Sequence, residues 1–442
     1  MLSFTKGLAT AGIALAASMG AAVASPYDEY AGETLVVNFP AHPHYNAVMK
    51  ILPEFTKETG IEVEVDQLPY LKMRERQTLE LAQDEGDYDL IAYVVFSKAD
   101  YVYADQLENL AKYFMNPKLA DPAFDSADLI DGYVKNIGFA GGDKGYLDGA
   151  TGSLYGLPYG SETSVLGYRK DIFEKHGLEV PTTYDEMLEL ACKIPELEPG
   201  MGGLSSRAAS GHHAAHAFLL HLNPLGGAIF DDQWNPVVNN AEGVAAAEAL
   251  KKIVECGPEG AASFGFGEAL GSFLNGDTAM FLDTTVVSGQ IDDPSKSQVV
   301  GKVGWAMHPM GVKRASQTGG FGIGIPKNAE NKEAAFLLMQ WLTSKHGDKL
   351  VALAGGNPSR FSTHADADVN AKFPHMATFG EALQYADPDW RPIIPVWGKI
   401  NADLGTTLSK VLTEDLDVQT ALDGVAERTK AVMEEAGYYT WQ

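Results

Sequence analysis

The sequence predicts an α/β protein of two lobes, each a mixed sheet flanked by helices, from three observations. The chain has 442 residues, which is too long for one hydrophobic core and sufficient for two. Strand and helix patterns alternate over residues 33–95, as in a parallel α/β sheet. Another strand–helix unit lies at residues 318–360, so the α/β pattern returns late in the chain. With 45% hydrophobic and 21% charged residues, the composition is that of a globular protein.

The N-terminus has the features of a signal peptide. Lys6 precedes a small apolar stretch at residues 8–23, and the sequence AVA at residues 22–24 fits a small-x-small cleavage site. We expect cleavage near Ala24 and export to the periplasm. The alternative is a membrane anchor, but the stretch is short and rich in Ala and Gly. No later window reaches the roughly 18–20 apolar residues of a transmembrane helix.

The charge of the chain bounds its partners. The formal net charge is −26 at pH 7. An acidic protein repels phosphate groups, so nucleic acid and anionic lipid are not expected partners. The charge indicates a well-solvated surface and says nothing about the fold.

The chain has two cysteines, Cys192 and Cys256. In an oxidising compartment they can form a disulfide. The alternative is two small buried thiols. Two cysteines 64 positions apart do not make a zinc pattern.

The first third predicts three strands and two helices. The strands cover residues 33–39, 61–65 and 90–95, and the helices cover residues 45–59 and 71–83. We expect an aromatic loop over residues 93–103. Parallel α/β sheets bind ligands beyond the carboxyl ends of their strands. That rule places five candidates on one rim: His42, His44, Phe96, Ser97 and Tyr101.

The middle of the chain predicts a second α/β region. After a glycine-rich loop at residues 138–160, we place the first crossing between lobes at residues 155–162. Thr183 and Glu186 form a capping box at the start of a helix. Residues 203–240 are rich in polar and aromatic side chains and carry no predicted element. The remaining elements are strands at residues 165–169, 278–282 and 303–307 and helices at residues 170–176, 241–255 and 265–275.

The late strand–helix unit begins with a glycine-rich strand that ends at Pro326, because proline cannot donate to a ladder. The helix after it has Asn331 as a plausible N-cap. Its apolar residues share one face: Ala334, Leu337, Leu338, Trp341 and Leu342. Two more helices are predicted at residues 399–412 and 418–436.

Several motifs are spread in order over most of the mature chain. They are LYGLPY at residues 154–159, LGYRKD at 166–171, LNGDTAM at 274–280 followed by Asp283 and Thr284, GIGIPK at 322–327, KEAAF at 332–336 and AVMEEAGY at 431–438. Together they resemble the extracellular solute-binding proteins of bacterial ABC importers, in the sugar- and polyol-binding branch.

The resemblance implies a two-lobed periplasmic binding protein fold, type II-like, that closes about a hinge. The lobes would be discontinuous, with residues 25–156 and 312–360 in lobe I and residues 157–311 and 361–442 in lobe II. It implies a monomer that captures a sugar, a polyol or a related small hydroxylated solute without a cofactor and without chemistry. The partner would be the transmembrane permease of the ABC importer.

The resemblance also implies roles in ligand binding. A polyhydroxylated solute needs charged hydrogen-bond partners and a flat ring to stack on. Arg207 and Asp283, with Thr284 beside it, would supply the charged partners, and Glu162 lies just past the crossing. The candidates for stacking are Trp397, Phe321, Tyr159, Phe96 and Tyr101. The structural alternatives are an ion pair, a loop acid or a core aromatic.

His212 and His213 stand where polyol-binding relatives often carry a Trp-Gly pair, and Phe321 stands where many carry Trp. This departure removes two indoles and adds imidazoles. It favours a solute smaller than a disaccharide, or one with negative charge. Asn357 and Ser359 could reach the solute or could only form the turn.

Two other classes of function are weighed against this one. A metal-binding receptor would use His42, His44, His212 and His213, although no Cys/His spacing marks a closed site. A secreted carbohydrate-active enzyme would use paired acids, but the sequence has no nucleophile elbow, P-loop or HExxH motif. We therefore expect no catalytic residue, no metal and no cofactor.

Overall fold

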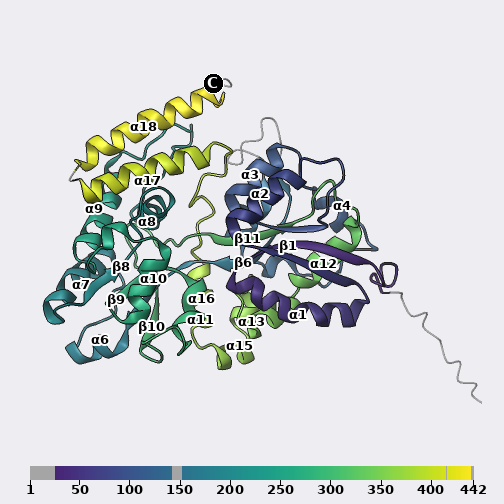
Figure 1. The fold of residues 1–442 in the computed structure, drawn as a ribbon, viewed down its shortest axis with the longest axis horizontal. Helices are drawn as coiled ribbons and strands as arrows, with labels where there is room; N and C mark the ends of the chain where they lie inside the picture. Colours follow the sequence, from purple (N-terminus) through teal and green to yellow (C-terminus); the bar gives the residue numbers. More distant parts are fainter. Residues whose placement is uncertain (1–24, 142–151, 415, 440–442) are drawn as a thin grey trace, which may run out of the picture.

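The computed structural model describes residues 25–141, 152–414 and 416–439. The predicted signal peptide lies outside the described residues. The chain forms two lobes side by side, with its N-terminal part (purple and blue) in one and its C-terminal helices (yellow) in the other (Figure 1). No helix among the described residues has the length and apolar character needed to cross a bilayer.

A five-stranded mixed sheet is the centre of the first lobe. In spatial order its strands are β2 (Glu62–Leu68), β1 (Thr34–Pro40), β3 (Leu90–Val94), β11 (Gly319–Gly324) and β6 (Leu157–Glu162). β1 is parallel to β2 and β3, whereas β11 is antiparallel to β3 and β6. The late glycine-rich strand therefore returns to the first sheet. At Gly320 (φ +88°) a Cβ would lie 2.0 Å from the carbonyl oxygen of Gly160, so this close approach requires glycine.

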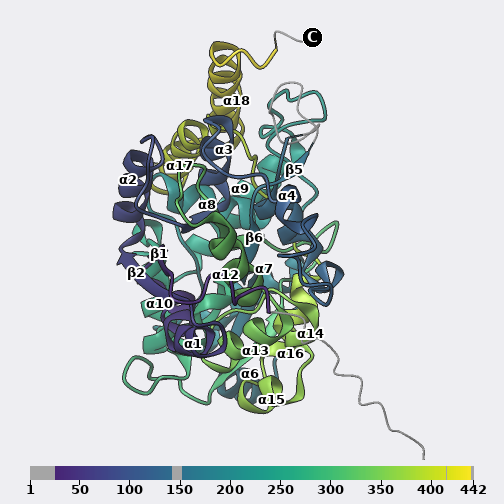
Figure 2. The same ribbon diagram turned by 90° about the vertical axis from the view of Figure 1, so that its right-hand side faces the viewer.

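Helices pack on both faces of this sheet (Figure 2). They are α1 (Pro43–Thr59), α2 (Tyr70–Glu80), α3 (Val95–Tyr103), α12 (Lys332–Leu342) and α13 (Lys345–Leu353). Alternate residues of β3 face opposite ways: Leu90 belongs to the core on the α1 and α12 side, and Ile91 belongs to the core on the α3 side. The predicted apolar face of α12 is buried, with Leu337 and Leu338 fully inaccessible.

A four-stranded mixed sheet is the centre of the second lobe. Its strands are β10 (Val303–Met307), β7 (Ser164–Arg169), β9 (Thr278–Thr284) and β8 (Gly202–Ser205). β8 is parallel to β9, and the other pairs are antiparallel. The helices of this lobe are α6 (Lys170–His176), α7 (Tyr184–Leu197), α8 (His212–Leu222), α9 (Ala241–Glu255), α10 (Phe266–Asn275), α17 (Trp397–Thr413) and α18 (Val418–Glu435).

Short elements complete the described chain. They are α4 (Ala111–Phe114), α5 (Asp131–Tyr133), α11 (Ser288–Ile291), α14 (Phe361–His364), α15 (Ala367–Lys372), α16 (Met376–Leu383), β4 (Phe139–Ala140) and β5 (Ser153–Leu154), with 3-10 or π turns at Ser126–Asp128, Val134–Gly138, Ala261–Ser263 and Thr285–Val287. α16 packs on β10 and β7 and therefore lies against the second sheet.

Hydrogen bonds tie together the segments that cross between the two sheets. β6 and β7 are separated only by Thr163, whose Oγ1 donates to the Gln317 carbonyl over 3.1 Å. The Gln317 N–H donates to Ser164 Oγ over 3.1 Å, and Asp387 N donates to the Ser316 carbonyl over 2.9 Å. Residues 157–162, expected in lobe II, pair with β11 and form the edge strand of the first sheet.

The long helices are confirmed, although α1 and α17 begin two residues earlier than predicted, at Pro43 and Trp397. Thr183 and Glu186 make the predicted capping box, and the helix at residues 241–255 has its predicted bounds. Residues 95–103, expected as a loop, form α3, because Ala99 and Val102 bury one face of a helix. Residues 212–222 also form a helix. This helix was not predicted, because its side chains are buried on nearly every face and its histidines interrupt the apolar pattern.

A series of hydrogen-bonded buried side chains lies beside the segments that cross between the two sheets. Ser164 Oγ is 2.8 Å from His308 Nδ1, and His308 Nε2 is 2.9 Å from the Tyr184 hydroxyl. Tyr184 in turn lies 3.1 Å from His221 Nδ1. Burial lowers the pKa of His308 to about 3 and the pKa of His221 to about 4. Both imidazoles are therefore neutral in the folded protein at neutral pH.

Cys192 and Cys256 form a disulfide that joins α7 to the end of α9. Of the two states that the sequence left open, this is the one in the structure. A cross-link over a sequence separation of 64 residues restricts the unfolded chain strongly.

The first prediction concerns this disulfide. The double variant Cys192→Ser/Cys256→Ser will lose about 2–4 kcal/mol of unfolding free energy, because its unfolded state regains the entropy of an open loop. Chemical denaturation of the variant and the wild type measures the difference. Reduction of the wild type should reproduce it. Equal denaturation midpoints for oxidised and reduced protein would contradict the prediction.

The second prediction concerns pH. Between pH 3 and 6.5 the unfolded chain binds a proton at His308 that the folded chain excludes, so stability is lost as pH falls below 6.5. Each such histidine contributes about 1.4 kcal/mol per pH unit in this window. Asp348, whose pKa burial raises to about 6, acts with the opposite sign. We expect a lower unfolding free energy at pH 5.0 than at pH 7.5.

The His308→Gln variant should show a shallower pH dependence, because one proton-binding site of the unfolded chain is removed. His346→Gln is the matched control, since its side chain is exposed in the folded protein. Chemical denaturation at a series of pH values measures both slopes. A slope that His308→Gln leaves unchanged would contradict the prediction.

Candidate functional site

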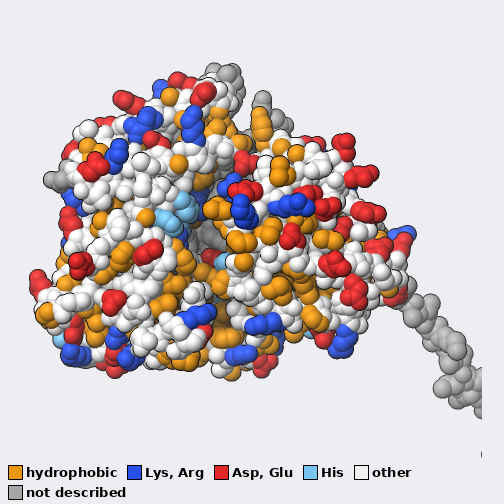
Figure 3. All heavy atoms as spheres, in the orientation of Figure 1, with side chains coloured by type: hydrophobic (Ala, Val, Ile, Leu, Met, Phe, Trp, Pro, Cys, Tyr) orange, Lys and Arg blue, Asp and Glu red, His pale blue; other side chains and the backbone are white. Residues whose placement is uncertain are grey.

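The surface is hollowed between the two lobes, and histidine side chains gather on one wall of this cleft (Figure 3). Strands of both sheets end near it. β6 of the first sheet leads to Glu162, and β9 of the second sheet leads to Asp283 and Thr284. The cleft is therefore where predicted residues from both lobes meet.

Arg207 and Asp283 form a buried bidentate ion pair on the second lobe. Arg207 Nε donates to Asp283 Oδ2 over 2.7 Å, and Nη2 donates to Oδ1 over 2.6 Å. The residues are 76 positions apart and meet because β8 and β9 are parallel, which places their carboxyl ends together. Burial by itself would raise the pKa of Asp283, but Arg207 and His216 hold it well below its ordinary value. Asp283 is therefore ionised.

Glu162 connects the two lobes. Its Oε2 accepts a hydrogen bond of 2.7 Å from Thr284 Oγ1, at the end of β9. Its Oε1 lies 3.1 Å from His42 Nε2, at the N-terminus of α1. The Thr284 N–H donates to Asp283 Oδ1 over 2.7 Å. Four residues predicted for the site, His42, Glu162, Asp283 and Thr284, thus form one continuous polar set.

Two residues that the sequence analysis did not select extend this set. His216 Nε2 lies 3.6 Å from Asp283 Oδ1, and His216 Nδ1 accepts a hydrogen bond of 2.7 Å from Arg391 Nη2. Because arginine can only donate, the His216 proton is on Nε2, facing the carboxylate. Burial and Arg207 lower the pKa of His216 to about 3, although Asp283 acts in the other direction. Arg391 lies 4.0 Å over the ring of Trp390, which also contacts His216.

His212 is the first residue of α8 and lies one turn before His216, with ring centroids 5.9 Å apart. Asn401 Nδ2 of α17 lies 3.3 Å from His212 Nδ1. Desolvation, with Arg391, His216 and Arg207, lowers the pKa of His212, although part of the residue is exposed. Three neutral imidazoles, His212, His213 and His216, therefore line this wall.

The aromatic candidates of the first lobe belong to its core. Phe321 lies 4.9 Å from the His42 ring and is 6% exposed. Tyr159 is inaccessible and packs edge-on against His44 at 4.6 Å. His44 Nδ1 accepts a hydrogen bond of 3.1 Å from Asn357 N, and burial lowers its pKa well below the ordinary value. His44 therefore holds the turn at Asn357 in place.

The remaining candidates are dispersed. Trp397, at the first turn of α17, is 2% exposed and belongs to the hydrophobic core of the second lobe. Ser97 is buried in α3, and Ser359 Oγ lies 2.8 Å from Ser161 Oγ, beneath the crossing. Phe96 lies in α3, but its side chain is outside the described part of the structure.

The metal-binding alternative is not favoured. In the part of the chain that the structure describes, no group of three or more His, Cys, Asp or Glu side chains could hold a metal ion. His44 is turned inward toward Asn357, whereas His212 and His213 belong to the opposite lobe.

Sequence signals for the missed residues were weak. His212 and His216 are four positions apart, so a helix over this stretch would have placed both on one face. The four-residue spacing is informative only if a helix is predicted there, and the polar histidines obscured the apolar pattern that would predict one. Arg391 stands next to Trp390 in an irregular segment, where no periodicity indicates which side chain faces the cleft.

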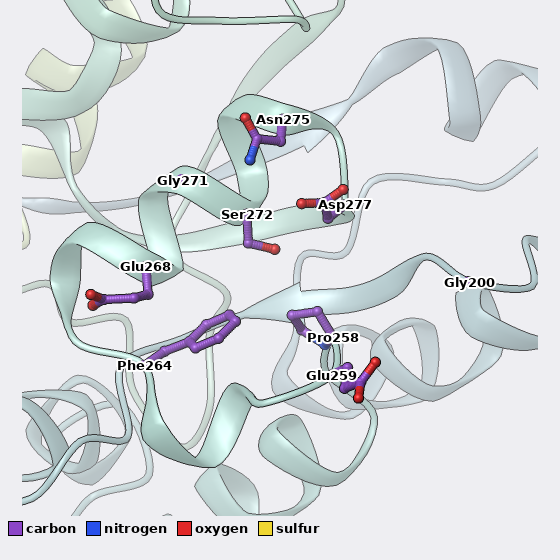
Figure 4. A pocket seen from close by; sticks show the side chains of 9 residues that line it. All are labelled: Gly200, Pro258, Glu259, Phe264, Glu268, Gly271, Ser272, Asn275 and Asp277. Carbon is purple, nitrogen blue, oxygen red and sulfur yellow. The ribbon is translucent and has the colours of Figure 1, made fainter.

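A separate pocket of about 430 Å³ lies on the second lobe, beside α10 (Figure 4). Its lining includes Glu259, Glu268, Ser272 and Asp277. Glu268 accepts a hydrogen bond from Gly265 N over 3.0 Å and so caps α10. None of the predicted ligand residues lines this pocket.

Comparison with known proteins relates this chain to one family. The sequence profile of the family described as "Bacterial extracellular solute-binding protein" matches residues 41–349, more than half of the chain. A mannitol-binding protein of Pseudomonas aeruginosa is 29% identical over 389 residues, which cover 83% of this chain and 85% of the relative. An erythritol/L-threitol-binding protein of Mycolicibacterium smegmatis is 24% identical over 71% of this chain and 67% of the relative.

Solved structures give the same assignment. A solute-binding protein of an ABC transporter from Agrobacterium radiobacter K84, in complex with ribitol, has a TM-score of 0.78 and 26% identity and covers 91% of this chain and 99% of its own. One from Agrobacterium vitis S4 with bound D-mannitol has a TM-score of 0.74 and 27% identity, over 92% and 99% of the two chains. The architecture is thus the two-lobed periplasmic binding protein fold that the sequence predicted, and the chain belongs to the bacterial extracellular solute-binding protein family.

Proposed function

We propose that this protein is the substrate-binding component of an ABC importer and captures a small hydroxylated solute, a sugar, a polyol or a relative of these. The observation that carries this proposal is the polar set in the cleft, in which Glu162 of the first sheet contacts Thr284 of the second beside the Arg207–Asp283 pair. The relatives named for mannitol, ribitol and erythritol support the solute class.

The chemistry of the set suits hydroxyl groups. Carboxylates accept hydrogen bonds from hydroxyls, and guanidinium and imidazole N–H groups donate to them. Asp283 and Glu162 provide the acceptors, and Arg207 and the histidines provide the donors. Charged hydrogen bonds in a buried cleft are short and directional, so they select the spacing of hydroxyls on a solute.

Solute binding and closure would be coupled through the cleft. A solute that contacts Asp283 on one lobe and Glu162 or His42 on the other stabilises the closed state by the contacts made only there. We propose the crossings at Thr163, Gln317 and residues 385–388 as the hinge, because they join the two sheets. Lobe I would then extend through Glu162.

The remaining proposals follow from the family. The mature protein acts in the periplasm after residues 1–24 are removed near Ala24. It works as a monomer that presents its closed form to the transmembrane permease. Binding and release require no covalent step, so no residue of the set is assigned a catalytic role and no cofactor is involved.

A thermal-shift screen tests the proposed function. The purified mature protein is heated with polyols, monosaccharides, disaccharides and sugar acids. At about 100 times its Kd a solute stabilises the folded state by about 2.7 kcal/mol, because it binds that state alone. We expect at least one hydroxylated solute to raise the melting temperature. A screen in which all of them leave it unchanged would contradict the proposal.

A further prediction concerns the buried ion pair of Arg207 and Asp283. Asp283→Asn keeps the shape of the side chain but removes its charge, so it should weaken binding of the best solute from the screen by about 10-fold or more, given roughly 1.5–3 kcal/mol per charged hydrogen bond. Arg207→Gln should act in the same direction. Titration calorimetry measures the affinities, and thermal unfolding without solute shows that each variant folds.

The matched control is the exposed pair of Arg428 and Asp403, whose Nε–Oδ1 distance is 2.9 Å, on α18 and α17. Asp403→Asn should leave the affinity unchanged, because a surface ion pair contributes little and lies outside the cleft. Unchanged affinity in both Asp283→Asn and Arg207→Gln would remove the buried pair from the site.

A further inference from the structure

Arg391 is a buried cation in the cleft. The residue is 8% exposed, and its Nε has no hydrogen-bond acceptor among the described residues. Its one hydrogen bond, from Nη2, goes to the neutral ring of His216. No carboxylate in the described chain forms an ion pair with it. Buried guanidinium groups ordinarily have an anionic partner, because an unpaired charge is costly to bury.

The nearby carboxylates make their direct contacts with groups other than Arg391. Asp283 holds Arg207 through both oxygens and accepts the Thr284 N–H as well. Glu162 uses one oxygen for Thr284 Oγ1 and the other for His42. Both acids interact with Arg391 only at a distance, as the electrostatic effects on its pKa indicate. Arg391 therefore has no direct anionic partner in the described chain, and a bound anion would have to supply one.

Arg391 lies against the wall of the second lobe, where it contacts His216 and Trp390. Its charge acts on Tyr70 of α2 in the first lobe, and on His212 and His216 of α8 in the second. Burial lowers the pKa of Arg391 to about 9, and Arg207 adds to that shift. Arg207 and Arg391 both lower the pKa of His212. The ion pair with Asp283 therefore does not remove the effect of Arg207 on this imidazole. The charged groups around this wall include Arg207, Arg391, Asp283 and Glu162, and within the described chain only Arg207 of the two arginines is in a direct ion pair.

We infer that the solute is a hydroxylated acid of the sugar-acid class, whose carboxylate pairs with Arg391 while its hydroxyls bind the Asp283–Glu162 set. This inference rests on the proposed function and narrows it. A neutral polyol would offer Arg391 only hydroxyl oxygens and would leave its charge buried without an anion. A carboxylate would supply both the acceptor that Nε lacks and the missing negative charge.

Matched pairs of solutes test this inference. Ribitol and D-ribonate, and D-mannitol and D-mannonate, differ at one terminal carbon, which is a hydroxymethyl group in the polyol and a carboxylate in the acid. Titration calorimetry with the wild type should give an affinity at least about 10-fold higher for the acid of one pair, equivalent to about 1.4 kcal/mol. Arg391→Gln should bring the two members of that pair to within about threefold. Arg428→Gln, on the surface, should keep the preference.

The outcomes separate the two proposals. A polyol that binds as tightly as its acid in both pairs overturns this inference and leaves the proposed function standing. Binding of no solute here or in the thermal screen overturns both. Should Arg391→Gln not fold, Arg391→Lys keeps the charge and should still favour the acid. Arg391→Lys could also lose the preference for the acid while its polyol affinity stays unchanged. That result would show that recognition needs the planar guanidinium group and would overturn the role given to the charge.

Discussion

The buried carboxylate of Asp283 is the interaction on which the rest of the cleft depends. An ionised acid away from water must be surrounded by donors, and Asp283 receives them from Arg207, from the Thr284 backbone and, at longer range, from His216. Each of these contacts fixes a second one. Thr284 is held beside Glu162, and His216 is held as the tautomer that accepts from Arg391. One carboxylate thus orders the polar groups of the second lobe.

The fold brings these groups together through discontinuous lobes. β11 lies between β3 and β6, although more than 150 residues separate it from either strand in the sequence. The chain must therefore leave the first sheet, build the second and return. The crossings converge at Thr163, Gln317 and Ser316, where hydrogen bonds join them side by side. A hinge of short segments that are hydrogen-bonded to one another permits the two lobes to rotate as rigid bodies while the core of each lobe stays packed.

The histidines give this family member its particular character. His212, His213 and His216 all lie on α8, at one wall of the cleft. His216 is buried, and burial and the two arginines lower its pKa, so its imidazole stays neutral, whereas His212 reaches the surface. The relatives named for polyols bind uncharged solutes. Beside the histidines of this protein, the guanidinium groups of Arg207 and Arg391 lie over the rings of Phe266 and Trp390, so both cationic and aromatic groups surround this wall.

Periodicity and caps along the chain were sufficient to predict the α/β class, most strands and long helices, and the return of residues 318–360 to an α/β unit. These features are local, since a helix or strand repeats over a few residues. The resemblance pointed to Arg207, Asp283 and Thr284, and the place after the crossing pointed to Glu162; their role in ligand binding stays a prediction. The sequence did not identify α8, Arg391 or the inward turn of His44. Whether a histidine caps a loop, fills a core or lines a cleft depends on which distant segment packs against it, and only the folded chain brings those segments together.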